Sequence, residues 1–387
     1  MNFVYLSPHF PPNFINFAVQ LRALGANVLG LADVPYEQLS PLLQGALTEY
    51  YRVDDLHSYD QLVRALGFFT HRYGKIDRID SHAEYWLETE ANLRTDFNIT
   101  GIKNDVIRQM KSKSEMKEIF REAGVAVARG QVVQYLEQAR DFVTQVGYPL
   151  VAKPDIGVGA AATYKVDNDG QLEDVFRDKP AGDTFLEEFI VGQLYSFDGL
   201  VNRDGELVFF TSHHFSQGIM ETVNNDDHIF YYSLREIPAD MEDAGRKLIK
   251  AFDLRERFFH FEFFRTTKDH RLVALEVNMR PPGGLTTDMF NYANDIDIYR
   301  EWANVVMHNR FEVHYDRRHH CGYVGRKYSK NYRHSREEIL ARYGTLVCHH
   351  EEIQSIFAPA IGNYAFLLKT ESLDVAREAA GYILELA

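Results

Sequence analysis

Two carboxylates and an amide in the segment 258–284 have the spacing of a metal site. The segment reads FFHFEFFRTTKDHRLVALEVNMRPPGG, in which two apolar runs flank a polar stretch, and this pattern predicts a β-hairpin. Side chains alternate between the two faces of a strand, so Glu276 and Asn278 share one face. A hairpin that folds near Asp269 places Glu262 opposite or nearly opposite Glu276.

Opposed carboxylates need a cation between them. Two bare carboxylates about 5 Å apart repel by about 3 kcal/mol at an effective dielectric constant near 20. Hard divalent cations take oxygen ligands and keep places for water and phosphate. Glu262, Glu276 and Asn278 therefore predict a Mg²⁺ site for a nucleotide, with Mn²⁺ as a second option. The competing interpretation is a solvated hairpin face whose carboxylates pair with Arg265 and Arg280.

A Pro-Pro-Gly-Gly turn directly after Arg280 favours the site over the solvated face. Paired glycines let backbone approach a ligand closely, and prolines give the turn its direction. Gly283 and Gly284 are therefore predicted to bind a substrate carboxylate through their N–H groups. His213, on the strand before the hairpin, is a further predicted substrate contact. The alternative for all three is an ordinary hydrogen-bonded loop or strand residue.

Two lysines are candidates for contacts with phosphate. Lys153 ends a predicted strand and precedes a loop that contains Gly157 and Gly159. Such a lysine can approach phosphate while backbone N–H groups of the loop approach the oxygens. A tight turn is the competing explanation of the loop. Lys113 stands at the start of a predicted helix, where it has by itself the features of a surface lysine.

Adjacent carboxylates, Glu187 and Glu188, lie in the apolar strand predicted at 185–190. One interpretation is an edge strand that leaves for solvent. The other is a hinge at which backbone groups and a carboxylate meet the amino group of adenine.

The elements that carry these residues begin with a β-α-β rhythm. A strand is predicted at 1–6, with helices near 59–73 and 84–97, which suggests an open α/β domain. Asn13 is expected to cap the first helix. No G-x-G-x-x-G follows the first strand, so the dinucleotide-binding fingerprint is absent.

Periodic apolar residues predict further helices at 103–123, 136–146 and 294–306. The basic, histidine-rich stretch 311–318 is interpreted as a domain boundary. The segment after it is expected to form a small α+β appendage.

Composition limits the classes of function. The chain has 387 residues, of which 45% are hydrophobic and 25% charged, as in globular proteins of two or three domains. A net charge of −14 argues against general nucleic-acid binding. Cys321 and Cys348 are the only cysteines, which predicts a reducing compartment. No leader peptide and no run of about 18 apolar residues is found, so a soluble cytoplasmic protein without membrane partners is expected.

In this order, over roughly residues 104–303, the motifs resemble the ATP-grasp superfamily. Within it they resemble the biotin-carboxylase-like carboxylate–amine ligases of the L-amino-acid ligase type. Lys113, in K-x₁₀-G-V, is similar to the first nucleotide lysine of the family. Lys153 with Gly157 and Gly159 looks like the second lysine and the phosphate-covering loop.

The resemblance also assigns the adenine hinge. Glu187 and the backbone at Glu188 and Ile190 would contact the base. Family members commonly place an acidic residue two positions after the hinge glycine, where it holds the ribose hydroxyls, but this chain has Leu194 there. Gln193 is the predicted substitute for that contact.

The resemblance implies a two-step reaction. A carboxylate attacks the γ-phosphate of ATP to give an acyl phosphate and ADP, and an amine then displaces phosphate. Glu262, Glu276 and Asn278 would hold Mg²⁺, and Arg280 would steady the transferred phosphoryl group. The implied partners are a small carboxylate and a small amine, and the oligomeric state stays open, with a homodimer as one option.

The fold class that the resemblance implies is α/β and α+β. An N-terminal open α/β domain would precede an ATP-grasp fold with a small lid subdomain, and a C-terminal α+β subdomain would follow. The predicted domains are 1–101, 102–185 with the lid at about 125–185, 186–318 and 319–387.

Two other functions remain open. A small-molecule kinase on the same fold would stop after phosphorylation and form no amide. A nucleotide-binding regulatory protein would bind ATP without turnover.

Overall fold

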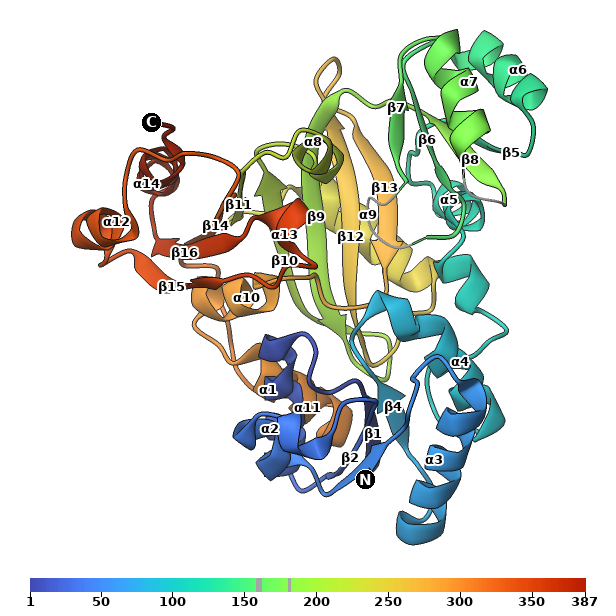
Figure 1. Cartoon of the computed structure of the whole chain (residues 1–387), viewed down its shortest axis with the longest axis vertical. Coiled ribbons are helices and arrows are strands. Elements are labelled where there is room, and N and C mark those ends of the chain that lie inside the picture. Colours follow the sequence, from blue (N-terminus) through green and yellow to red (C-terminus); the bar gives the residue numbers. More distant parts are fainter. Residues whose placement is uncertain (158–161, 180–181) are drawn as a thin grey trace.

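The computed structural model describes residues 1–157, 162–179 and 182–387. Three sheets are found in this part of the chain, one of eight strands and two of four. Figure 1 shows the eight-stranded sheet in the middle, with the lobe that carries α6 and α7 above it and the N-terminal lobe below.

The N-terminal sheet is parallel, with strand order β3-β2-β1-β4. This confirms the open α/β domain that the β-α-β rhythm predicted. Its elements are β1 (Asn2–Leu6), α1 (Ile15–Ala23), β2 (Asn27–Ala32), α2 (Pro41–Ala46), β3 (Glu49–Arg52), α3 (Tyr59–Tyr73), β4 (Arg78–Asp80) and α4 (Leu87–Asp96).

Asn13 does not cap the first helix, so that prediction was wrong. Pro12–Phe14 forms a 3₁₀ turn, and α1 has Phe14 at its N-cap. The Asn13 amide instead donates to the Gly284 carbonyl at 3.0 Å and to the Asp288 carboxylate at 2.8 Å. Asn13 therefore ties the N-terminal lobe to the large sheet's lobe.

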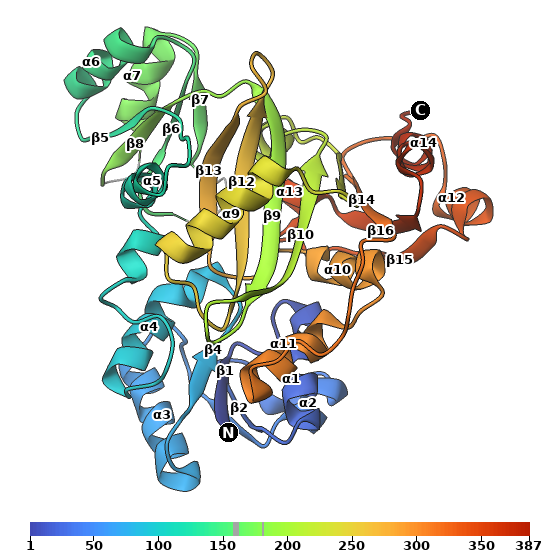
Figure 2. The ribbon, with the colours of Figure 1, turned by 180° about the vertical axis from the view of Figure 1, so that it is seen from behind.

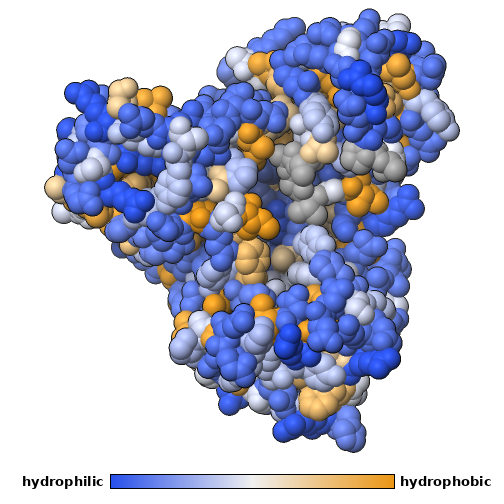
Figure 3. All heavy atoms as spheres, in the orientation of Figure 1, coloured by the Kyte–Doolittle hydropathy of each residue, from blue (hydrophilic) through white to orange (hydrophobic). Residues whose placement is uncertain are grey.

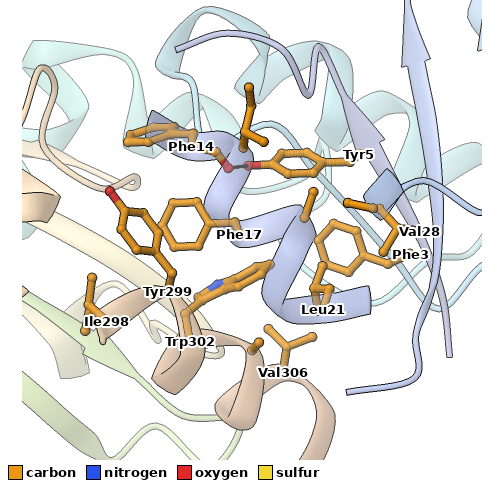
Figure 4. Close-up of a cluster of buried hydrophobic side chains, with 14 of the residues drawn as sticks. Phe3, Tyr5, Phe14, Phe17, Leu21, Val28, Ile298, Tyr299, Trp302 and Val306 are labelled. Atoms are coloured by element: carbon orange, nitrogen blue, oxygen red, sulfur yellow. Dashed lines mark hydrogen bonds between the residues drawn. The ribbon is translucent and has the colours of Figure 1, made fainter. Parts of the chain in front are cut away.

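An aromatic core joins α1 to α11 (Ile298–His308), a helix of the central lobe. Phe17 lies with its ring centroid 4.7 Å from that of Tyr299 and 4.9 Å from that of Trp302. Figure 4 shows these rings between the two helices, with Phe3 to their right, beside Val28. Burial of such large apolar surfaces fixes the N-terminal lobe on the central one.

The large sheet has strand order β13-β12-β9-β10-β11-β14-β16-β15. Its strands are β9 (Gly192–Val201), β10 (Leu207–Phe215), β11 (Ile229–Ser233), β12 (Arg257–Thr266), β13 (Leu272–Asn278), β14 (His320–Arg326), β15 (Val347–Glu352) and β16 (Tyr364–Thr370). The helices around it are α8 (Ile219–Asn224), α9 (Ala239–Ala251), α10 (Thr286–Asn294), α12 (Arg336–Tyr343), α13 (Ala358–Ile361) and α14 (Leu373–Leu384).

The C-terminal segment is not a separate appendage in this sheet. β14 pairs with β11, and β16 and β15 follow, so these strands extend the sheet that carries the hairpin. The basic stretch 311–318 therefore does not separate two sheets. The predicted helix at 294–306 corresponds to α11, which begins later, at Ile298, and ends at His308.

The second four-stranded sheet, called here the small sheet, has order β5-β8-β6-β7. Leu150, Ala152 and Leu186 pack into the apolar core on one of its faces. Lys153 and Glu187 alternate with these residues and so lie on the other face. The elements are β5 (Gly130–Val133), α6 (Leu136–Val146), β6 (Leu150–Pro154), β7 (Tyr164–Val166), α7 (Asp169–Asp178) and β8 (Thr184–Glu188), preceded by α5 (Lys113–Glu122).

The surface is hollowed between the lobe of the small sheet, the C-terminal strands and the N-terminal lobe, as Figure 3 shows. Within the described ranges, no helix is long and apolar enough to cross a membrane.

Candidate active site

The hairpin of β12 and β13 has the register that its sequence predicted. Glu262 pairs directly with Glu276, and His260 pairs with Asn278. Phe261 and Val277 lie on the opposite face of the sheet, in the apolar core beneath α9. Figure 2 shows α9 lying across that face. The face that carries Glu262 and Glu276 is called here the inner face.

Burial and neighbouring charges move the pKa values of the two carboxylates apart. Burial raises the pKa of Glu276, Lys113 partly counters this, and Glu84 and Glu262 raise the pKa further. Burial also acts to raise the pKa of Glu262, but the hydrogen bond and positive charge of His260 outweigh it and lower the pKa. A cation bound between the two carboxylates would lower both pKa values, because it favours their charged forms.

A buried chain of polar residues supports Glu262. His260 donates to Asp198 at 2.5 Å and to Glu262 at 3.3 Å. Burial acts to lower the pKa of His260, yet Asp198 and Glu262 raise it to about 9. His213 donates to the second oxygen of Asp198 at 2.8 Å.

His213 was a predicted substrate contact, but its side chain is fully buried. It lies one strand further from the hairpin, behind Asp198. His213 can therefore influence a substrate only through Asp198 and His260. The alternation of β9 and β10 was not enough to reveal this from the sequence.

The start of α5 and the end of β6 are held together around one buried carboxylate. Asp155 accepts from the Ser112 hydroxyl at 2.7 Å and from the Ser114 N–H at 2.8 Å. Its carbonyl accepts from the Lys113 N–H at 2.9 Å. These bonds bring Lys113 and Lys153 to the same region, where both side chains are buried.

Lys113 is therefore not the exposed surface lysine that its position alone suggested. It is 5% exposed, and it acts on the charge of Glu276 more strongly than the other groups nearby. Lys153 also acts on Glu276. The carboxylate pair and both predicted phosphate lysines thus belong to one site.

Sequence reasoning missed a third lysine, Lys117. Its ammonium lies 2.9 Å from Glu187 Oε2, and the Lys153 ammonium lies 3.4 Å from Glu187 Oε1. Lys117 is 1% exposed. Because Lys117 is one helical turn after Lys113, it shares the same face of α5, and this i, i+4 spacing was the available signal.

The segment after β8, predicted to be the adenine hinge, has a backbone N–H group that can bind a ligand. Glu188 is anchored, because its N–H donates to the Arg129 carbonyl and its carboxylate accepts two bonds from the Arg129 guanidinium. Within the described ranges, the Ile190 N–H donates no hydrogen bond. A base edge can therefore hydrogen-bond to the backbone at this position.

Arg280 meets a residue of the N-terminal lobe. Its guanidinium donates to the Glu84 carboxylate at 2.9 Å, and both side chains are mostly buried. Glu84 is a second residue that the sequence did not identify, because 196 positions separate the two along the chain.

The turn after Arg280 has the form needed to bind an anion. Gly284 has φ +62°, a conformation that glycine adopts without strain. In the part of the chain that the structure describes, the N–H groups of Gly283 and Gly284 donate no hydrogen bond. They are therefore available to a ligand.

Three further residues, two glycines and a glutamine, were predicted to contact the nucleotide. Gly159 lies outside the described residues, whereas Gly157 is described and packs near Pro154. Gln193 pairs in register with Arg265, and Arg265 binds Asp240 of α9 on the face away from Glu262. Because directly paired residues lie on the same face of a sheet, the Gln193 side chain also lies on that face. We therefore correct the prediction and leave Gln193 out of the nucleotide site.

The residues present fit a divalent cation. Two carboxylates and the Asn278 amide share the inner face, and their oxygens leave positions for water and phosphate. Within the described residues, no three His, Cys, Asp or Glu side chains form a complete metal cluster. The ion would thus be held partly by the phosphates of a nucleotide, as is common for Mg²⁺.

A groove of about 750 Å³ lies elsewhere, between β10 and the segment 309–317. It contains none of the carboxylates or lysines described above. Its charged and aromatic lining has no arrangement that would perform a reaction, so the inner face remains the candidate active site.

Comparison with known proteins agrees with this fold. Residues 146–288 match the family model described as an ATP-grasp domain. The matched segment covers less than half of the chain and includes β6, β8 and the hairpin of β12 and β13.

Its relatives include ligases. The chain is 22% identical over 284 residues to the L-arginine-specific L-amino acid ligase of Bacillus subtilis, covering 70% of this chain and 67% of that protein. It is 25% identical over 198 residues to the carbamoyl phosphate synthase large chain of Clavibacter michiganensis subsp. michiganensis, covering 47% of this chain but 17% of that relative. The crystal structure of an L-amino acid ligase from Bacillus licheniformis superposes with a TM-score of 0.76 at 16% identity, covering 99% of this chain and 96% of that one.

Proposed function

We propose that this protein is an ATP-dependent ligase that joins a carboxylate to an amine through an acyl phosphate. The observation that carries the proposal is the directly opposed pair Glu262 and Glu276, within electrostatic reach of Lys113 and Lys153. A fold that places two carboxylates together needs a cation there, and the lysines provide for the phosphates.

The nucleotide would lie between the small sheet and the inner face. Lys113 and Lys153 would neutralise phosphate oxygens, and Glu187 with the backbone at Glu188 and Ile190 would contact adenine. Glu262, Glu276 and Asn278 would hold Mg²⁺, which when bound neutralises charge on the β- and γ-phosphates.

The residues of the chain then act by positioning and by charge. A substrate carboxylate oxygen attacks the γ-phosphorus, the bond to the β-phosphate oxygen breaks, and ADP leaves. An amine nitrogen next attacks the acyl carbon, loses a proton, and phosphate leaves. Arg280 would hold the transferred phosphoryl oxygens, because its planar guanidinium binds such oxygens through two donors.

The substrate class we propose is an α-amino acid. Arg280 and Glu84 present a cation and an anion side by side, 2.9 Å apart. A zwitterion is complementary to that pair. Gly283 and Gly284 would add N–H donors for a carboxylate. The similarity to two L-amino acid ligases supports the same class.

Glu276→Ala tests the metal assignment. We expect ADP release in the presence of amino acids, ATP and Mg²⁺ to fall at least about 100-fold, because a metal ligand that stabilises transition-state charge is lost. The measurement is coupled ADP detection with mass spectrometry of the products.

Glu242→Ala on α9 is the matched control, because it removes a half-buried glutamate that pairs with Arg246 on the opposite face of the sheet. Circular dichroism should show both variants folded. Full turnover in Glu276→Ala would exclude the metal assignment. A phosphorylated acceptor without amide product in the wild-type protein would indicate a kinase instead.

A further inference from the structure

Lys117 has no part in the reaction described so far, although it is among the most deeply buried charges of the molecule. Its side chain is 1% exposed, and Glu187 beside it is 3% exposed. Burying an ammonium and a carboxylate costs several kcal/mol for each ion before they attract each other. A pair that serves only stability could be replaced by apolar residues at no loss.

The contact between Lys117 and Glu187 is close and closed to solvent. The Lys117 ammonium lies 2.9 Å from Glu187 Oε2, and both atoms are buried. Burial lowers the pKa of Lys117, and the charge of Glu187 opposes this shift. Lys117 therefore fixes the position of one oxygen of Glu187.

Lys117 and Lys153 each contact a different carboxylate oxygen of Glu187. Lys117 takes Oε2, which is closed to solvent, and Lys153 donates to the other oxygen, Oε1. A carboxylate has about four acceptor sites, so Oε1 can accept a second donor. Lys153 at 3.4 Å is only loosely held by Glu187, which leaves its ammonium able to bind a phosphate.

We infer that Lys117 is a positioning residue for the nucleotide. It fixes the orientation of Glu187, so that Glu187 accepts a hydrogen bond from the amino group of the base and Lys153 remains available to the phosphates. This inference rests on the proposed nucleotide site. Lys117 touches neither base nor phosphate and acts through Glu187.

A consequence is base specificity. Adenine offers an amino group at the position where guanine has a carbonyl oxygen, and a fixed carboxylate accepts from the first and repels the second. Without Lys117, the Glu187 carboxylate is expected to turn toward Lys153, and the distance between Glu187 Oε1 and the Lys153 ammonium, now 3.4 Å, is expected to shorten. Both the contact to the base and the charge for the phosphates are then weakened.

The test compares wild type with Lys117→Met, which keeps the length of the side chain and removes the charge. We expect the dissociation constant for ATP, measured by calorimetry, to rise about 10-fold or more, the effect of losing a charged hydrogen bond. The preference for ATP over GTP in KM should fall by a similar factor, while kcat at saturating ATP changes little. Lys247→Met, at an exposed lysine of α9, is the control and should change neither quantity.

A double-mutant cycle separates positioning from folding. If Lys117 acts through Glu187, Lys117→Met combined with Glu187→Gln should bind ATP and GTP as Glu187→Gln does alone. Glu187→Gln keeps the inference testable if Lys117→Met does not fold, because it should itself reduce the preference for ATP over GTP.

Three further outcomes would overturn either the inference about Lys117 or the proposed function. A folded Lys117→Met protein with lower thermal stability but an unchanged ATP preference would overturn the inference and leave Lys117 structural. Wild-type protein that binds neither ATP nor GTP would overturn the proposed function itself. Wild type that prefers ATP, with additive effects in the cycle, would overturn only the role through Glu187.

Discussion

At the scale of single residues, the charge of each group in this site depends on its neighbours. His260, whose pKa is raised to about 9, lowers the pKa of Glu262. Burial raises the pKa of Glu276, and Lys113 only partly counters this. The two directly opposed glutamates therefore have pKa values shifted in opposite directions, and a divalent cation bound between them would favour the charged form of both.

Leu194 stands where the resemblance to ATP-grasp proteins implies an acidic residue. Its side chain is 4% exposed and belongs to an apolar cluster with Phe215 and Ile229. Gln193 lies on the other face of β9. The described residues around β9 thus supply no acidic group at the usual position for the ribose hydroxyls.

We predict that ATP and 2′-deoxyATP are used almost equally, with kcat/KM values within about 3-fold, because the usual charged hydrogen bond to the ribose, a contact of about 1.5–3 kcal/mol, is missing. The measurement is ADP or 2′-deoxyADP release at a range of nucleotide concentrations. A preference for ATP above about 30-fold would show that another group holds the ribose.

At the scale of elements, α10 connects the two larger lobes through a buried acid. The Asp288 carboxylate accepts from the Asn13 amide at 2.8 Å and from the Tyr299 hydroxyl at 2.9 Å. Burial raises the pKa of Asp288, and these two hydrogen bonds only partly counter that. An acid with a raised pKa in the folded state favours folding when protonated, so its contribution is lost as pH rises through the folded-state pKa.

Asp288→Asn should therefore change the pH dependence of stability. The difference in melting temperature, variant minus wild type, should increase by about 2–4 °C between pH 4 and pH 8, since asparagine does not ionise. Thermal unfolding followed by circular dichroism at several pH values measures this. Asp60→Asn, at an exposed acid of α3, is the control. A difference that stays constant with pH would contradict the assignment.

At the scale of the whole molecule, the site is complete only with the N-terminal lobe in place. Arg257 of β12 lies 3.5 Å from Asp80 and 3.6 Å from Glu90, and Arg94 lies 2.8 Å from Glu90. This buried network connects the end of β4 to the large sheet. It holds the loop that presents Glu84 to Arg280.

We predict that Glu84→Gln raises the KM for the amino acid substrate about 10-fold and leaves the dissociation constant for ATP unchanged, because one charged hydrogen bond to the substrate ammonium is lost. Steady-state kinetics and calorimetry provide the two values. Glu88→Gln, at an exposed glutamate that pairs with Lys111, is the matched control. Equal effects on amino acid and ATP would instead indicate that Glu84 only orients Arg280.

Much of this protein follows from local sequence. The hairpin register that opposes Glu262 and Glu276 depends on strand alternation and on one short turn, so a few neighbouring residues determine it. The helices at 59–73 and 136–146 follow from apolar periodicity and a terminal glycine in the same way. Order and spacing along the chain also indicated the resemblance to ATP-grasp proteins, which the match at residues 146–288 supports.

The remaining features depend on contacts between residues far apart in sequence, and only the tertiary structure decided them. Glu84 meets Arg280 because two lobes dock, Lys117 meets Glu187 because α5 packs beside the small sheet, and β14 joins the sheet of the hairpin. The i, i+4 spacing of Lys113 and Lys117 places both on one face of α5 but does not name Glu187 as a partner, because these contacts arise when finished elements pack together. The type of chemistry could therefore be inferred from the sequence. The residues that complete the site, Glu84 and Lys117, could be identified only from the way the elements pack.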